Sequence, residues 1–147
     1  MNTIENAKEI ISSYKRDDGK KLRIMEVCGT HTHEIFRLGI RKLLPESVEL
    51  ISGPGCPVCV TPIGFIDEAC MLALEKGAVI CTFGDLIRVP GTEMSLAGAR
   101  SKGAVIKTVY SPLDAVSYAD SHRDEQVVFL AVGFETTTPS ACLAVEK

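Results

Sequence analysis

The sequence predicts an α/β fold, in which a mostly parallel sheet of about five strands is flanked by helices. Short apolar runs recur along the chain, and segments with helical spacing lie between them. Strands that alternate with helices form βαβ units, and such units build a parallel sheet. A length of 147 residues suits one hydrophobic core, so a single α/β domain over residues 1–147 is expected.

The expected strands are five apolar runs, and runs of this length are typical of strands buried on both faces. They cover residues 22–27, 48–51, 78–83, 104–109 and 127–132. The clearest helix between them has apolar residues at helical spacing, namely Ile66, Ala69, Cys70, Ala73 and Leu74. A further helix is expected before the first strand, with one apolar face made by Ile4, Ala7, Ile10, Ile11 and Tyr14 and an end near residues 17–19.

Three hydroxyl–proline pairs predict helix starts. They are Thr61-Pro62, Ser111-Pro112 and Thr138-Pro139. A hydroxyl at the N-cap accepts a hydrogen bond from a free backbone N–H, and proline is favoured at the first helical position. Ser111 also has Asp114 three residues later.

The loops that follow the strands hold most of the chemically reactive residues. In chain order they read "CGTHTHE", "GPGCPVCVTP", "GDLIRVPGTE", "YSP" and "GFETTTP". Right-handed crossovers place all of these loops at the carboxyl edge of a parallel sheet. The candidate functional site is therefore expected at that edge.

Composition and charge exclude several classes of protein. The chain carries 16 Lys+Arg against 19 Asp+Glu, a formal charge of -3, with no extended basic cluster. Nucleic acid is therefore not an expected partner. The N-terminal stretch carries acidic residues and lacks the uninterrupted apolar run of a signal peptide, and no segment approaches the length of a membrane span. A cytoplasmic protein is therefore expected.

Cys56 and Cys59 form a C-x-x-C pair just before the expected helix start at Thr61-Pro62. A helix N-terminus lowers the pKa of a nearby thiol, and two thiols at this spacing form a disulfide reversibly. The alternatives are a metal clip and a tight turn that holds two inert thiols. The shaped backbone around Gly53, Pro54 and Gly55 favours the redox pair over the inert turn.

Cys28 and His31 have C-x-x-H spacing on the loop after the first strand. Together with Cys56 and Cys59 they make a legitimate four-ligand zinc set, so a structural zinc module stays open as an alternative. A self-sufficient α/β core does not need such a metal. A soft-metal site that uses the Cys28 thiolate, such as an iron site, fits an open sheet edge better.

Each of the remaining candidate residues has both a possible functional role and a possible structural role. Asp85 and Arg88 suit either an ion pair with each other or a contact with a substrate, and Glu135 suits a proton carrier or a helix N-terminus. His33 and Glu34 are expected to be structural. Three further cysteines are expected in the core, namely Cys70, Cys81 and Cys142.

Five motifs, in this order, resemble the N-terminal portion of the hydrogenase maturation factor HypD family. They are "MEVCGTHTHE", "SGPGCPVCVTP", "FGDLIRVPG", "VYSPLDAV" and "VGFETTTPSA". The resemblance implies a role in [NiFe]-hydrogenase maturation, as a scaffold on which the Fe(CN)2CO group is assembled, and not as a conventional turnover enzyme. It also implies two partners, a HypC-type small chaperone and HypE.

The resemblance implies roles for individual residues. Cys28 matches the cysteine that holds the iron fragment together with a cysteine of the HypC-type partner, with His31 nearby. Cys56 and Cys59 match the redox-active pair, and Asp85, Arg88 and Glu135 match other motif positions. Family members are longer and carry a C-terminal cysteine set for a [4Fe-4S] cluster, so this chain is expected to be the N-terminal part of a longer architecture. The alternative outside this family is a general thiol-disulfide oxidoreductase.

Overall fold

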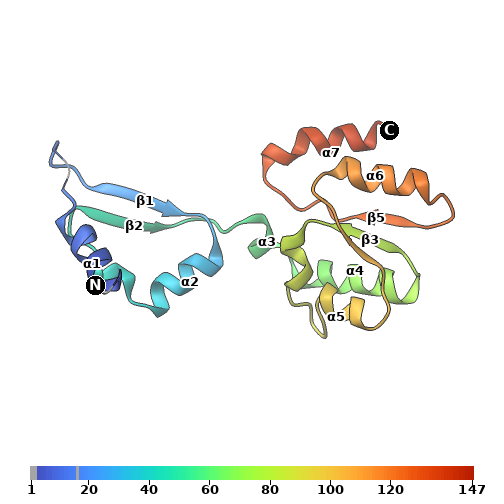
Figure 1. Ribbon diagram of the computed structural model, residues 1–147, viewed down its shortest axis with the longest axis horizontal. Coiled ribbons are helices and arrows are strands. Elements are labelled where there is room, and N and C mark those ends of the chain that lie inside the picture. The colour runs from blue at the N-terminus through green and yellow to red at the C-terminus, as the bar shows by residue number, and fades with distance from the viewer. Residues whose placement is uncertain (1–2, 16) are drawn as a thin grey trace. The chain divides into compact units, whose positions relative to one another are not determined.

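The computed structural model describes residues 3–15 and 17–147 (Figure 1). By its internal contacts the chain divides into two compact units, Met1–Cys59 and Val60–Lys147, called unit 1 and unit 2 below. All five predicted strands are present, and each pairs in parallel with its neighbours. They are divided between a two-stranded and a three-stranded sheet. The predicted α/β class is confirmed.

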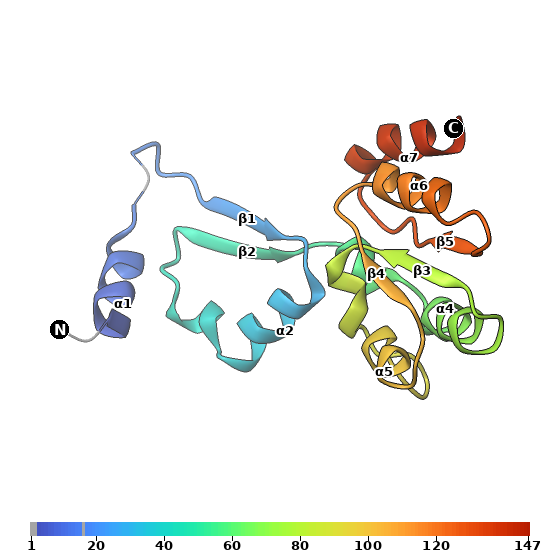
Figure 2. The ribbon, with the colours of Figure 1, turned by 45° about the vertical axis from the view of Figure 1, so that its right-hand side comes forward.

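Unit 1 contains the two-stranded sheet. Strands β1 (Leu22–Glu26) and β2 (Val48–Ser52) pair in parallel, from Leu22 opposite Val48 to Glu26 opposite Ser52. The helical elements that begin in this unit are α1 (Thr3–Ser13), α2 (Gly29–Arg37), η1 (Ile40–Leu43) and α3 (Pro57–Val60). Helix α2 and the 3-10 helix η1 connect the two strands and lie along one side of the pair (Figures 1 and 2).

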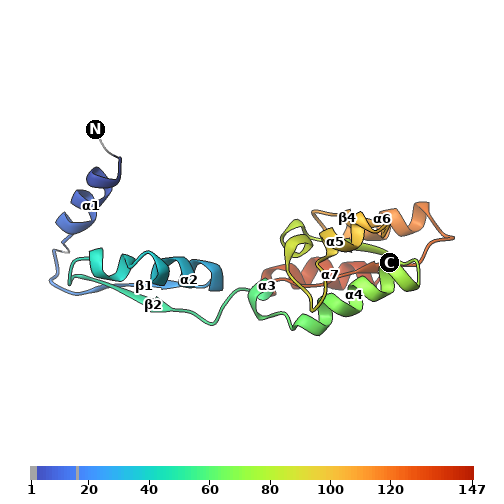
Figure 3. The same ribbon diagram turned by 90° about the horizontal axis from the view of Figure 1, so that it is seen from below.

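Unit 2 contains the three-stranded sheet. Its strands are β3 (Val79–Thr82), β4 (Ile106–Thr108) and β5 (Val127–Phe129), in the order β4-β3-β5. The helical elements are α4 (Ile63–Glu75), η2 (Gly84–Arg88), α5 (Leu96–Ser101), α6 (Pro112–Ser121), η3 (Glu135–Thr137) and α7 (Thr138–Val145). Helices α6 and α7 lie on one side of this sheet, and α4 and α5 contact each other on the other side (Figures 1 and 3).

The core of unit 2 forms where α4 packs against the central strand. Every residue of β3 is buried. The apolar stripe predicted for α4 is confirmed at its first four positions, Ile66, Ala69, Cys70 and Ala73, which are all buried. Leu74 at the end of the stripe is exposed.

The prediction that all five strands are buried is confirmed in full only for β3 among the described strands. Strand β5 is half-buried, β4 has one buried residue, and β1 and β2 have none. The prediction fails most clearly for β1. Ile24 and Met25 follow each other in this strand and so point to opposite faces, yet they are 43% and 54% exposed. β1 belongs to a sheet of only two strands, and each of its residues is half-buried or exposed. An apolar run alone does not distinguish such a strand from the fully buried β3.

One of the three predicted helix starts is confirmed. Ser111 caps α6: its hydroxyl accepts from the Leu113 N–H at 3.2 Å, and Asp114 accepts from the Ser111 N–H at 3.0 Å. The other two N-cap predictions are wrong. Helix α4 has Pro62 at its N-cap, and Thr138 is already helical because η3 leads directly into α7.

Helix α1 is present and ends at Ser13, several residues before the predicted end. Of its predicted apolar face, Ile10 and Tyr14 are exposed and Ile11 is partly buried, while the side chain of Ile4 lies outside the described residues. Among the helices of the described ranges, none has the length and apolar character that a membrane span requires.

Candidate functional site

The candidate site is built where β1 and β2 end side by side. Because Glu26 and Ser52 are the last partners of the parallel register, the loops after both strands begin at the same edge. The Gly53 N–H donates to the Glu26 carbonyl at 2.8 Å and extends the pairing by one step. These two loops carry Cys28 and the C-x-x-C pair, as the sequence predicts.

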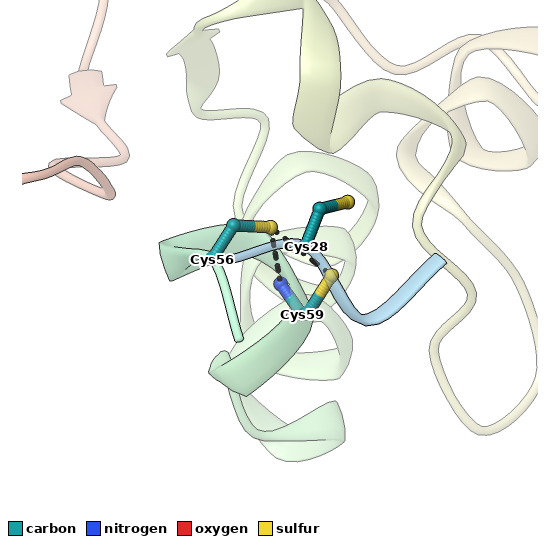
Figure 4. A group of neighbouring side chains, drawn as sticks. All are labelled: Cys28, Cys56 and Cys59. Carbon is teal, nitrogen blue, oxygen red and sulfur yellow. Dashed lines mark hydrogen bonds between the residues drawn. The ribbon is translucent and has the colours of Figure 1, made fainter. Parts of the chain in front are cut away.

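Three sulfur atoms converge at this edge. The Sγ atoms of Cys28, Cys56 and Cys59, called the thiol site below, all lie within 4.8 Å of one another (Figure 4). Cys28 and Cys56 are half-buried and Cys59 is exposed. Thiolates are soft ligands, so this arrangement can hold a soft or borderline metal ion. Two thiols at C-x-x-C spacing, as in Cys56 and Cys59, can also form a disulfide reversibly.

The two thiols of the C-x-x-C pair are bonded to each other. The Cys56 thiol donates to Cys59 Sγ at 3.0 Å, and the Cys59 N–H donates to Cys56 Sγ at 3.4 Å (Figure 4). Gly55 before them has a φ of 94°, a conformation that favours glycine and turns the chain into α3. The pair therefore stands at the start of its own four-residue helix, and not at the start of α4 as predicted.

The pKa values of the two thiols shift in opposite directions. The hydrogen bond from the Cys56 thiol lowers the pKa of Cys59 to about 7, and the backbone N–H groups of Gly29 and Thr30 lower it further. Donating that same hydrogen bond raises the pKa of Cys56. Both donating amides belong to the first turn of α2. The first proton to leave the pair therefore leaves from Cys59, while Cys56 stays protonated.

This difference predicts the pH dependence of alkylation. Only the thiolate reacts with iodoacetamide, so the rate at Cys59 should rise with pH through a midpoint of about 7. Peptide mass spectrometry after short exposures measures that rate residue by residue. A short peptide with one cysteine serves as the control and should show a midpoint near ~8.5. A Cys59 midpoint equal to that of the peptide would contradict the prediction.

The structure does not bring His31 into the thiol site. His31 lies in α2 and is exposed, and among the described residues the group of close ligand atoms consists of the three cysteines. The thiol site therefore supplies three of the four ligands that the zinc hypothesis names. His33 is exposed in the same helix, and Glu34 forms an ion pair with Arg37 at 2.5 Å.

Glu26 is a residue of this region that the sequence analysis missed. Its Oε1 atom accepts from the Thr32 hydroxyl at 2.8 Å, and this hydrogen bond lowers the pKa of Glu26. Thr32 also approaches the Cys28 carbonyl at 3.2 Å, so Glu26 ties α2 to the end of β1. The available signal was its spacing, because a residue two positions before Cys28 shares a face with it in extended chain.

The other predicted site residues lie in unit 2. Asp85 and Arg88 are exposed in η2, and no ion pair joins them in the part of the chain that the structure describes. Glu135 is exposed at the start of η3, where it lines a cavity of about 160 Å³ together with Phe83 and Phe129.

The prediction of three core cysteines is confirmed for two of them. Cys70 and Cys81 are buried, and burial raises the pKa of both thiols. The prediction is wrong for Cys142, which is exposed. Its helix α7 contacts α6, and none of its described residues is buried. Cys142 is therefore an exposed surface thiol outside the thiol site.

Comparison with known proteins agrees with the resemblance of the motifs. The sequence pattern of the HypD family, described as "Hydrogenase formation hypA family", matches residues 2–147. The chain is 52% identical over 132 residues to the hydrogenase maturation factor HypD of Azotobacter vinelandii, covering 89% of this chain and 35% of that protein. It is 47% identical over 147 residues to HypD of Escherichia coli, covering 100% and 39%.

A third relative, HypD of Cupriavidus necator, is 54% identical over 130 residues, which cover 88% of this chain and 34% of that protein. The chain thus spans little more than a third of the length of these relatives.

Proposed function

The chain belongs to the HypD family, and from that premise we propose that it acts in the maturation of [NiFe]-hydrogenases. In this proposal the thiol site belongs to a scaffold for assembly of the Fe(CN)2CO group. Cys28 holds the iron, and Cys56 and Cys59 form a redox-active thiol/disulfide pair. The observation that carries the proposal is the convergence of the three sulfur atoms within 4.8 Å.

The hydrogen bonds around the thiol site support this division of roles. Cys56 and Cys59 bond to each other through their sulfur atoms. The Cys28 sulfur makes no hydrogen bond in the described part of the chain, so its lone pairs are available to a metal. A thiolate is a suitable ligand for iron, which is the cargo of the scaffold and not a resident cofactor. The dithiol pair supplies two electrons when it closes to a disulfide.

Other parts of the proposal come from the family. They are a cytoplasmic location, a HypC-type chaperone that donates a second cysteine to the iron, HypE as a further partner, and a [4Fe-4S] cluster as electron source in the longer family architecture. His31, Asp85, Arg88 and Glu135 are proposed as further functional positions, because each stands in one of the matching motifs.

The test is the variant Cys28→Ala, combined with the HypC-type partner. We expect the infrared bands of the iron-bound cyanide and CO ligands to disappear, while the Cys56–Cys59 pair still forms its disulfide. Cys142→Ser is the matched control, because it removes an exposed thiol outside the thiol site and should keep the bands. Bands that persist at full intensity in Cys28→Ala would refute the iron assignment.

A general thiol-disulfide oxidoreductase is the second candidate function. It is favoured by the exposure of Cys59 and by the lowered pKa of its thiol. This function predicts steady reduction of insulin disulfides at a rate that Cys28→Ala leaves unchanged. A scaffold predicts one stoichiometric exchange and no sustained turnover.

A further inference from the structure

The two thiols of the C-x-x-C pair have unequal surroundings. The Cys59 sulfur accepts from the Cys56 thiol at 3.0 Å and from the backbone N–H groups of Gly29 and Thr30. The Cys56 sulfur accepts one backbone N–H, that of Cys59, at 3.4 Å. Cys59 is also exposed, whereas Cys56 is half-buried. A negative charge is therefore better stabilised on Cys59, the sulfur that a substrate reaches more easily.

The donors to Cys59 come from a helix other than its own. Cys56 directly precedes α3, but that helix has only four residues. Helix α2 has nine residues, and the Cys59 sulfur lies against its first turn. Gly29 makes this approach close: a Cβ atom at that position would lie 3.4 Å from Cys59 Sγ.

We propose that Cys59 is the attacking thiol of the pair and that Cys56 is the resolving thiol. The inference rests on the proposed function, because it assigns the order of events within the thiol/disulfide couple named there. It adds to that function by specifying which of the two sulfur atoms reacts first with a substrate disulfide. A choice based only on the helix after Pro57 would favour the opposite order, since Cys56 stands at its start.

The sequence of bonds follows from this assignment. The Cys59 thiolate attacks one sulfur of a substrate disulfide RSSR, a Cys59–SR bond forms, the S–S bond breaks and one RS⁻ leaves. Cys56 then gives its proton to solvent and attacks the Cys59 sulfur. The Cys56–Cys59 disulfide forms and the second RS⁻ leaves. Two electrons have passed from the pair to the substrate, which is fully reduced.

The test compares Cys56→Ser with Cys59→Ser in a parent that carries Cys28→Ser and Cys142→Ser. These background changes remove the half-buried and exposed thiols outside the pair, and Cys70 and Cys81 are buried. The probe is Ellman's reagent, an aromatic disulfide, with stopped-flow detection of the released thiolate at pH 7. Mass spectrometry of the peptides locates each mixed disulfide.

We expect the Cys56→Ser variant to release one equivalent rapidly and to keep the mixed disulfide on Cys59. The Cys59→Ser variant should react on the order of tenfold more slowly, because its remaining thiol of the pair, Cys56, is half-buried and its sulfur accepts a backbone N–H only from residue 59. The parent should release two equivalents and end with a Cys56–Cys59 disulfide.

The opposite result is easily recognised. If Cys59→Ser reacts as fast as Cys56→Ser, the assigned order is wrong, although the redox pair itself stands. If the parent instead keeps two mixed disulfides and forms no internal one, the redox pair of the proposed function fails as well. Brief alkylation of the parent with limiting iodoacetamide, which requires no change at either cysteine of the pair, should label Cys59 before Cys56. Label on Cys56 first would overturn the inference even if a serine variant failed to fold.

Discussion

Gly53→Ala should separate Cys28 from the Cys56–Cys59 pair. A Cβ atom at position 53 would overlap the carbonyl oxygen of Glu26, which is a backbone atom and cannot rotate away. The Gly53 N–H also donates to that oxygen at 2.8 Å, so relief of the overlap breaks the last hydrogen bond between the two segments. The loops that carry the three thiols start from these segments, and the thiols should move apart.

The proximity of the three thiols can be tested with tris(bromomethyl)benzene, a reagent that links three neighbouring thiols. We expect the triply linked product of Cys28, Cys56 and Cys59 to fall severalfold in Gly53→Ala, while the link within the C-x-x-C pair is kept. Gly64→Ala is the matched control. It is the same substitution in helix α4, where a Cβ atom would meet nothing within 4 Å. Equal yields from the two variants would show that Gly53 does not hold the loops together.

Ile66→Ala should cause a large loss of stability in unit 2. Ile66 is 0% exposed and lies on the face of α4 that forms the core. Replacement by alanine removes three carbon atoms from close packing and leaves a cavity, which costs about 2–5 kcal/mol of unfolding free energy. Urea unfolding followed by circular dichroism measures the change.

Ile63→Ala is the matched control for this experiment. It is the same change in the same helix, one turn earlier, but Ile63 is 57% exposed. We expect a change within about 0.5 kcal/mol, because surface substitutions away from special features have small effects. A loss at Ile63 as large as that at Ile66 would mean that the exposed face of α4 is packed against something in the folded protein.

The sequence predicted correctly that Cys28 meets the C-x-x-C pair, but it did not predict correctly which other side chains join them. Parallel pairing alone places the loops after β1 and β2 at one edge, and this brings Cys28 to the C-x-x-C pair. The C-x-x-H spacing suggested that His31 would join them. In the structure Cys28 is the N-cap of α2, whereas His31 lies in the first turn of that helix, exposed and outside the group of close ligand atoms.

The origin of the thiol asymmetry could not be predicted from local sequence. The local sequence pattern predicts that the stabilising amides come from the helix after Thr61-Pro62, but the amides that lower the pKa of Cys59 belong to Gly29 and Thr30. These residues are far from Cys59 along the chain, and only the sheet register brings them close. Strand burial failed for a similar reason, because the exposure of β1 depends on the number of strands beside it and not on its own residues.

The two-stranded sheet of unit 1 links ligand binding at the thiols to folding. A sheet of two strands with exposed apolar residues is only marginally stable by itself, so unit 1 should open and close on a timescale visible by hydrogen exchange. Each opening separates Cys28 from Cys59. Any ligand that bonds to both sulfur atoms therefore binds only the closed state, and its binding free energy adds to the stability of β1 and β2. Slower exchange of the backbone amides in these strands would report occupancy of the site without any signal from the ligand itself.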